Sequence, residues 1–245
     1  KFANHVIHGC FSAKSKFVTL VNDHDLHVET FRGYGSTFMK RVVQCSPDAY
    51  VQMAIQLATF RLFGKQVATY ESTQVRPFLH GRTETTRSVS KQSAAFVNAM
   101  AHPQQGCSIE TKQVLLRDAM QQHVAYLKNA SQGQGVDRHF FGLQMLLQPQ
   151  EESPRLFEHA LFHRSKRWRV STSTLPGVTP GFGPVVWDGV GIGYDVQPYH
   201  CVFTVTARKE HGYTERLCHH LEEAMLEMQT LMMTDTDTNI PKSKL

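Results

Sequence analysis

The sequence predicts an α/β protein in which helices flank a mixed sheet, and three observations support this fold class. Apolar residues recur at helical spacing through much of the first 147 residues. After residue 166, four short segments instead have the composition and alternation of strands. No internal repeat, low-complexity segment or linker divides the chain. We therefore expect helices and strands to share one mixed domain of the α/β or α+β kind.

The first part of the chain is expected to hold a helix, a strand and a buried helix. Residues 1–24 show a modest helical pattern, and residues 25–31 alternate apolar and polar side chains, as a half-buried strand does. Ser46-Pro47-Asp48 is typical of a helix start, because Ser caps the first turn, Pro fits its first position and an acid suits the positive end of the helix dipole. This helix should end at Phe63-Gly64 and be buried, because it is apolar on nearly all sides.

Helices are expected first in the rest of the chain, and strands later. A buried strand begins near Gln66, after the long apolar helix. The further helices are expected at residues 91–101, 108–128 and 137–147, with a last one carrying an apolar stripe over residues 217–231. The further strands are expected at residues 167–175, 183–187, 191–196 and 200–208.

Composition and charge describe a globular chain with a mild basic excess. Of the 245 residues, 41% are hydrophobic and 19% charged, which argues against disorder. The formal charge is +5, and the positive residues are scattered, with the densest group at residues 164–169. A nucleic-acid-binding domain usually carries a longer basic stripe, so we expect no nucleic-acid partner. An anionic cofactor such as a nucleotide or coenzyme A would exploit the same charge.

The cysteines and histidines predict neither disulfides nor a metal site. The five cysteines are odd in number, widely spaced and without a CxxC pair, which is typical of free thiols in a reducing compartment. Adjacent histidines such as His219 and His220 have no clustered Cys or carboxylate partners. No apolar run approaches the roughly 18 residues that a membrane span requires.

The last three residues, Ser243-Lys244-Leu245, match a peroxisomal address. Chance is the alternative for so short a match, but its place at the very end favours the address. We therefore expect a domain over residues 1–240, a tail over residues 241–245, and recognition of the tail by a peroxisomal import receptor. The expected location is the peroxisomal matrix, with the mitochondrion as a second site.

The most informative stretch is Val67–Ser90, which follows a strand with a dense set of hydroxyl and guanidinium groups. Such a set at a strand end suits a small, polar, anionic ligand. A polar loop with surface arginines is the alternative, and composition leaves both interpretations open. Ser171-Thr172-Ser173 and Arg138 also leave two interpretations open. The serine and threonine hydroxyls would donate hydrogen bonds to a developing oxyanion, or they belong to an ordinary exposed strand. Arg138 would hold a carboxylate, or it is an ordinary arginine on a helix surface.

Several motifs taken together resemble the carnitine/choline acyltransferase family. They lie in the family's order and cover nearly the whole chain: Ser46–Tyr50 (SPDAY), Tyr70–Ser72 (YES), Gly81–Ser88 (GRTETTRS), Asp137–His139 (DRH), Ser171–Ser173 (STS) and Phe182–Val186 (FGPVV). The resemblance implies a CoA-dependent acyltransferase-like fold, of which this chain would be the C-terminal domain. It also implies reversible transfer of an acyl group, acetyl or longer, between acyl-CoA and carnitine, with no metal and no permanently bound cofactor.

The resemblance implies roles for individual residues. Tyr70, Thr83 and Arg138 would hold the carboxylate of carnitine, and Ser72 would also line the carnitine site. The substrate's trimethylammonium group would face Phe182, as a cation meets an aromatic ring. The catalytic role of Ser173 would be donation to the oxyanion of the tetrahedral species. Lys40 and Asp48 would line the coenzyme A site, and retention of Thr83 and Arg138 favours carnitine over choline.

One departure from the family pattern is important for function. The family's catalytic histidine lies in a Y-E-H type segment upstream of every matched motif, and no such segment occurs here. We therefore expect a missing N-terminal domain to supply the base and the isolated chain to be inactive. The first alternative is a non-catalytic fragment that binds coenzyme A or carnitine. The second, which the scattered cations favour less, is a basic nucleic-acid-binding domain.

Overall fold

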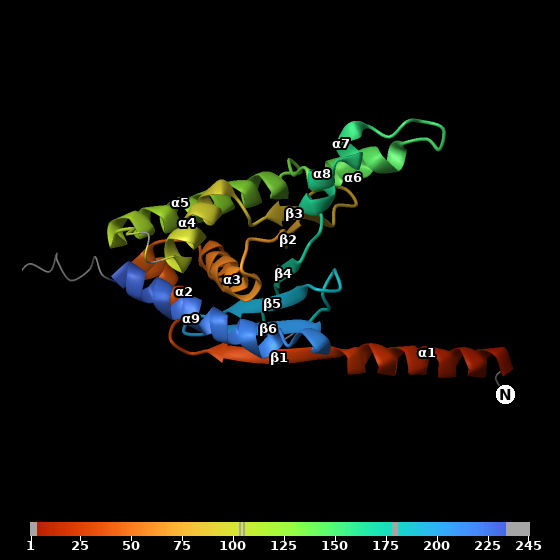
Figure 1. Cartoon of the computed structure of the whole chain (residues 1–245), viewed down its shortest axis with the longest axis horizontal. Helices are drawn as coiled ribbons and strands as arrows, with labels where there is room; N and C mark the ends of the chain where they lie inside the picture. Colours follow the sequence, from red (N-terminus) through yellow and green to blue (C-terminus); the bar gives the residue numbers. More distant parts are fainter. Residues whose placement is uncertain (1–3, 103, 105, 178–180, 234–245) are drawn as a thin grey trace, which may run out of the picture.

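Six strands form one mixed sheet in the computed structural model, which describes residues 4–102, 104, 106–177 and 181–233. Across the sheet the order is β1-β6-β5-β4-β2-β3 (Figure 1). The strands are β1 (His24–Phe31), β2 (Thr69–Gln74), β3 (Thr83–Arg87), β4 (Val170–Thr174), β5 (Val190–Val196) and β6 (Cys201–Arg208). The predicted fold class, a mixed sheet with flanking helices, is confirmed.

Strand direction brings distant motifs to one edge of the sheet. β4 runs parallel to both of its neighbours, β2 and β5, whereas the other pairs are antiparallel. Tyr70 on β2 lies opposite Ser171 on β4, although 101 positions separate them in the chain. Because parallel neighbours end at the same edge, the polar ends of β2 and β4 lie together.

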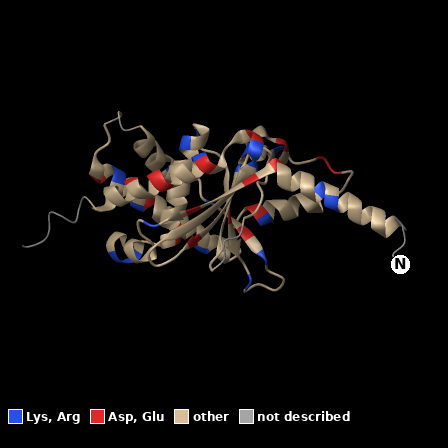
Figure 2. Ribbon diagram, turned by 90° about the horizontal axis from the view of Figure 1, so that it is seen from below, with Lys and Arg blue, Asp and Glu red and all other residues tan. Residues whose placement is uncertain are grey.

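The helices of the fold vary widely in length. They are α1 (Asn4–Asp23), α2 (Ser36–Phe38), the π-helical turn η1 (Met39–Val43), α3 (Pro47–Phe63), α4 (Lys91–Ala101), α5 (Ile109–Ser131), α6 (Asp137–Leu146), α7 (Arg155–Glu158), α8 (Ala160–Ser165), η3 (Lys209–His211) and α9 (Thr214–Met233). α3 packs against α4, α5 and α9 (Figure 1), and two of these helices also contact the sheet, α5 at β2 and β3 and α9 at β1 and β6. Lys, Arg, Asp and Glu are distributed over many of these elements (Figure 2).

The core is built around α3, as its sequence predicts. The Ser46 hydroxyl accepts a hydrogen bond from the Ala49 amide at 3.4 Å, and Gly64 ends the helix with a φ of +67°. Tyr50, Ile55 and other residues on all sides of α3 are buried. α9 packs against α3. Its Leu217, Leu221 and Met225 belong to the same core cluster, and the Met225 carbonyl oxygen accepts a hydrogen bond from the Tyr34 hydroxyl at 2.5 Å.

Two sequence predictions of local structure differ from the structure. The segment 183–187 is a turn-containing loop instead of a strand, because Pro184 has no amide to donate and Gly189 N bonds Val186 O at 3.0 Å. In contrast, β3 forms from a segment that resembles a polar loop. α1 matches its helical pattern but extends away from the domain (Figure 1), with Phe11 68% exposed.

The loop before β5 is held against the sheet by close backbone contact. A Cβ atom on Gly191 would lie 2.1 Å from the carbonyl oxygen of Phe182, so only glycine allows this approach. The contact places Phe182 directly on β5.

The five cysteines are unpaired, as predicted, and no helix among residues 4–233 that the structure describes is long and apolar enough to cross a membrane.

Candidate functional site

A guanidinium and two hydroxyl groups meet where β2 and β3 approach the start of α6. Arg138 Nη2 donates to the Tyr70 hydroxyl at 3.2 Å and to Thr83 Oγ1 at 3.4 Å. Its Nε donates to the Thr83 carbonyl at 2.9 Å. Arg138 and Thr83 are exposed and Tyr70 is half-buried, so the group is open to solvent. A cation with adjacent hydroxyls at an open edge can bind a small carboxylate.

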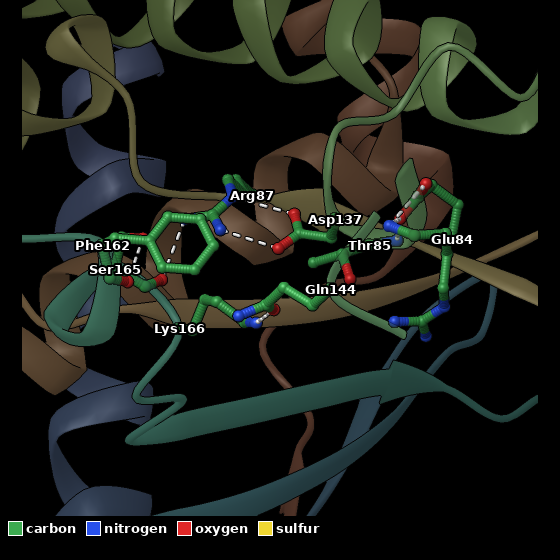
Figure 3. Close-up of polar contacts among 9 residues, drawn as sticks. Glu84, Thr85, Arg87, Asp137, Gln144, Phe162, Ser165 and Lys166 are labelled. Carbon is green, nitrogen blue, oxygen red and sulfur yellow. Dashed lines mark hydrogen bonds and ion pairs between the residues drawn. The ribbon is translucent and has the colours of Figure 1, made fainter. Parts of the chain in front are cut away.

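The position of Arg138 depends on an ion pair at the preceding residue. Asp137 accepts hydrogen bonds from Arg87 Nε at 2.9 Å and Nη2 at 2.7 Å, a bidentate arrangement between α6 and β3 (Figure 3). Arg87 Nη1 also donates to the Ser165 carbonyl at 2.9 Å. The Arg138 amide lies 3.3 Å from both carboxylate oxygens of Glu84. The first turn of α6 is therefore held against β3 at the Asp137 side chain and at the Arg138 amide.

A pair of serine hydroxyls lies on the neighbouring strands. Ser72 Oγ on β2 and Ser173 Oγ on β4 are 3.0 Å apart, and both residues are half-buried. Ser72 shares its face of β2 with Tyr70, because side chains alternate along a strand. The serine pair and the Arg138 group therefore occupy the same face of the sheet. Hydroxyls at such a position can donate to an oxyanion.

The opposite face of β2 carries a buried acidic and imidazole cluster. His123 Nε2 on α5 lies 3.1 Å from Glu71 Oε2 and 3.5 Å from Asp48 Oδ2 on α3. His123 and Glu71 are each only 3% exposed, whereas the Asp48 side chain is 28% exposed. Donor atoms of all three lie within 4.8 Å of one another, the only group of three His, Cys, Asp or Glu side chains this close among the residues the structure describes.

The protonation of this cluster follows from burial and mutual hydrogen bonding. Burial acts to lower the pKa of His123, but its bonds to Asp48 and Glu71 outweigh this and raise the pKa to about 9. Burial raises the pKa of Glu71 to about 7, although His123 acts in the opposite direction. For Asp48, burial is outweighed by hydrogen bonds from His123 and Tyr194, and its pKa is lowered. A protonated imidazole between carboxylates accounts for the directions at His123 and Asp48, whereas burial determines the direction at Glu71.

Neutral side chains extend this cluster into the core. The Tyr194 hydroxyl on β5 donates to Asp48 Oδ1 at 2.6 Å. Gln52 Nε2 donates to the Tyr194 hydroxyl and to Thr172 Oγ1, both at 3.0 Å. Asp48 is therefore fixed by a buried network, which differs from a side chain held free for a ligand.

A groove of about 370 Å³ opens beside the start of α3. Arg117 and Lys128 of α5 supply its positive charge, and Ser46 and Val124 are also in its wall. Neither Lys40 nor Asp48 is among its lining residues: Lys40 is exposed on η1, and Asp48 is in the buried cluster. The groove combines a helix N-terminus with two cations, which suits an anionic ligand.

The motifs of the sequence do not point to Glu71, His123, Arg117 or Lys128. Signals for the first two are present: Glu71 alternates with Tyr70 and Ser72, so it must face the core, where a carboxylate needs a partner. His123 lies seven positions after Leu116, on the buried side of its helix. The cations of the groove have no such signal, because exposed Arg and Lys are common along any helix.

Comparison with known proteins agrees with this arrangement of motifs. Residues 1–223 match the family model described as choline/carnitine O-acyltransferase. The chain is a member of the choline/carnitine O-acyltransferase family, and its curated relatives are acyltransferases.

The relatives include both carnitine and choline enzymes. Carnitine O-acetyltransferase of Rattus norvegicus is 37% identical over 239 residues, covering 95% of this chain and 37% of the relative. Choline O-acetyltransferase of Homo sapiens is 34% identical over 226 residues, covering 90% of this chain and 30% of the relative. Among solved structures, a chloramphenicol acetyltransferase aligns with 9% identity and a TM-score of 0.41. The alignment covers 83% of this chain and 88% of the chloramphenicol acetyltransferase chain.

Proposed function

We propose that this chain is the substrate-binding part of a carnitine O-acyltransferase, which transfers an acyl group reversibly between acyl-CoA and carnitine. The observation that carries the proposal is the contact of Arg138 with Tyr70 and Thr83, at 3.2 and 3.4 Å, on the sheet face that also bears the serine pair. Carnitine has a carboxylate for this guanidinium, and choline has none. The proposal therefore favours carnitine, although choline enzymes are also among the relatives.

The serine pair and Phe182 complete the proposed carnitine site. Ser173 donates to the oxyanion that forms when the carnitine hydroxyl adds to the thioester carbonyl, and Ser72 orients the Ser173 hydroxyl through their 3.0 Å contact. Phe182, fixed against Gly191, faces the trimethylammonium group. This division of roles places charge recognition at α6 and charge stabilisation at the ends of β2 and β4.

Acyl-CoA is the co-substrate in this proposal, and the groove at the start of α3 supports its binding. Arg117 and Lys128 can meet its phosphates, with Lys40 contributing charge from η1. Asp48 contributes by orienting the first turn of α3, because its carboxylate already bonds Tyr194. No permanently bound cofactor or metal is assigned. Since the carnitine enzymes among the relatives are acetyltransferases, acetyl-CoA is the first acyl donor to test.

The general base is assigned to a part of a longer protein. His123 lies behind β2, on the face opposite Ser72 and Ser173, so it cannot reach their substrate. The chain spans about 37% of the length of the rat relative, which leaves room for an N-terminal domain with the base. The chain alone should therefore bind substrates without turnover. Acyl transfer above background by the isolated chain would contradict this assignment.

The location is proposed from the terminal tripeptide alone. Ser243-Lys244-Leu245, which lies outside the described residues, supports import into the peroxisomal matrix through the import receptor. One yeast relative is named as mitochondrial, so a mitochondrial form is the alternative. Deleting the three residues from a fluorescently tagged protein and imaging its location distinguishes these two compartments.

Replacement of Arg138 by Ala in the full-length protein tests the central assignment. Charge-assisted hydrogen bonds contribute about 1.5–3 kcal/mol, so the KM for carnitine should rise about tenfold to a hundredfold. The KM for acyl-CoA should not change. Arg82→Ala is the matched control, because Arg82 is a neighbouring exposed arginine. An unchanged carnitine KM in Arg138→Ala would refute the assignment.

A further inference from the structure

The buried cluster behind β2 joins three elements that carry different parts of the proposed site. Glu71 belongs to β2, between Tyr70 and Ser72, and Asp48 belongs to the first turn of α3. His123 belongs to α5 and approaches both carboxylates, at 3.1 and 3.5 Å. One imidazole is therefore the contact between the strand of the carnitine side and the helix start on the acyl-CoA side.

Charge explains why this imidazole lies between the two carboxylates. The carboxylates of Glu71, which is buried, and of Asp48, whose side chain is 28% exposed, repel each other when both are charged, and a cation between them relieves this repulsion. The groups that face His123 are Glu71 from β2 and Asp48 from α3, with Tyr194 from β5 donating to the far oxygen of Asp48. Tyr194 donates a neutral hydrogen bond, so a protonated His123 is the cation that the described residues provide. The burial of His123 and Glu71 keeps their contact away from water.

The cluster has direct geometric consequences for substrate contacts. Side chains alternate between the two faces of a strand, so holding one side chain in place also fixes the backbone of its two neighbours, which project from the other face. Anchoring Glu71 therefore sets the orientation of Tyr70 and Ser72. On the other side, α5 carries His123 and also Arg117 and Lys128 of the groove. A shift of α5 would therefore move the groove together with the anchor of β2.

We infer that His123 is a positioning residue that couples the carnitine side of the site to the acyl-CoA side by bridging Glu71 and Asp48. The inference rests on the proposed function and adds to it a residue that touches neither substrate. Loss of the bridge should disturb both substrate sites at once. A residue that positioned only one substrate would disturb only that one.

The test is steady-state kinetics of His123→Gln in the full-length protein, in the direction that consumes acyl-CoA so that no free thiol titrates. Gln can keep one hydrogen bond but carries no positive charge. Loss of one charge-assisted contact predicts a rise of about tenfold in the KM for carnitine and also in that for acyl-CoA. His219→Gln is the control, because His219 is an exposed histidine on α9. It should change neither KM.

Two further measurements separate coupling from a general loss of structure. Glu71→Gln removes the partner instead of the imidazole, so it should raise both KM values as His123→Gln does, and the double variant should add little. In the unmodified protein, the two KM values should rise together as the pH approaches 9, because the bridge then loses its proton. This last measurement needs no variant and is decisive even where the variants fail to fold.

Three results would overturn the inference. One is that a folded His123→Gln variant changes one KM value or neither. Another is that the two KM values of the unmodified protein separate as the pH rises. The third is a stoichiometric divalent metal in the purified protein that is absent from His123→Gln, which would make the cluster a metal site instead. If Arg138→Ala raises the carnitine KM but His123→Gln does not, the proposed function stands and only the coupling fails.

Discussion

Replacement of Asp137 by Asn tests how the substrate-binding arginine is held in place. The Asp137 side chain is 6% exposed and its partner Arg87 is 24% exposed. The two form a bidentate pair at 2.9 and 2.7 Å (Figure 3). The guanidinium of Arg87 also lies 4.7 Å from the centre of the Trp168 ring. Asn keeps the shape of the side chain but removes the negative charge and one acceptor oxygen.

The magnitude follows from the degree of burial. Breaking a fully buried pair costs about 3–5 kcal/mol, whereas exposed pairs contribute about 0–1 kcal/mol. Arg87 is partly hydrated and keeps its bond to the Ser165 carbonyl, so a value between these limits applies. We expect Asp137→Asn to lower the free energy of unfolding by about 2 kcal/mol. The carnitine KM should also rise several-fold, because the next residue, Arg138, loses its fixed helix turn.

Urea-induced unfolding followed by circular dichroism measures the first effect, and initial rates measure the second. Asp118→Asn is the control, because Asp118 is an exposed acid on α5, and it should change stability by less than about 0.5 kcal/mol. A double-mutant cycle with Arg87→Gln isolates the pair itself. If Asp137→Asn costs less than about 0.5 kcal/mol, or the cycle finds no coupling, the pair does not hold α6 and the reasoning fails.

The remaining predictions concern pH, a helix cap and a close backbone contact. The free energy of unfolding should fall from pH 6.5 to about 9, because folded His123 keeps its proton to about 9 and the unfolded imidazole loses it near 6.5. Its contribution is complete below pH 6.5, and Glu71, whose pKa is raised to about 7 from 4.5, adds a loss of the same sign at lower pH. In urea titrations at several pH values, the free energy of unfolding of His123→Gln should therefore fall less steeply with rising pH than that of the unmodified protein. Ser90→Ala should cost about 1 kcal/mol in the same assay, because it removes the capping box of α4. Gly35→Ala should cost about 2 kcal/mol or more, because its Cβ would lie 2.2 Å from the Gln197 carbonyl oxygen; an unchanged midpoint in either variant contradicts the packing described.

The local signals of the sequence were sufficient for the long helices and for most strands, and insufficient for the short helices, for β3 and for the order of the sheet. α3 was predictable from Ser46-Pro47 at its start and Gly64 at its end, since both act through neighbouring residues. β3 was not, because TETTR has the composition of a polar loop and becomes a strand only through pairing with β2 and burial of Glu84. The order of strands depends on contacts between residues about 100 positions apart, and no local pattern reports those.

The same distinction applies to the candidate site. Tyr70, Thr83 and Arg138 were selected by motif resemblance, and the structure brings their polar atoms within hydrogen-bonding distance. Their roles toward carnitine stay predictions. Lys40 and Asp48 were selected in the same way, and their roles toward coenzyme A also stay predictions, although the cations that line the groove are Arg117 and Lys128. Whether a helix residue lines a groove depends on how α5 packs beside α3, which the motifs do not encode.

Adjacent positions on α5 have different freedom to vary during evolution. His123 is buried among carboxylates, so most replacements there carry a large penalty. Val124, the next residue, is 43% exposed and lines the groove. Drift at residue 124 can therefore alter the affinity for an anionic ligand while the fold stays intact. Single substitutions at such a position would change the affinity for one substrate while the buried residues that support binding of the other stay conserved.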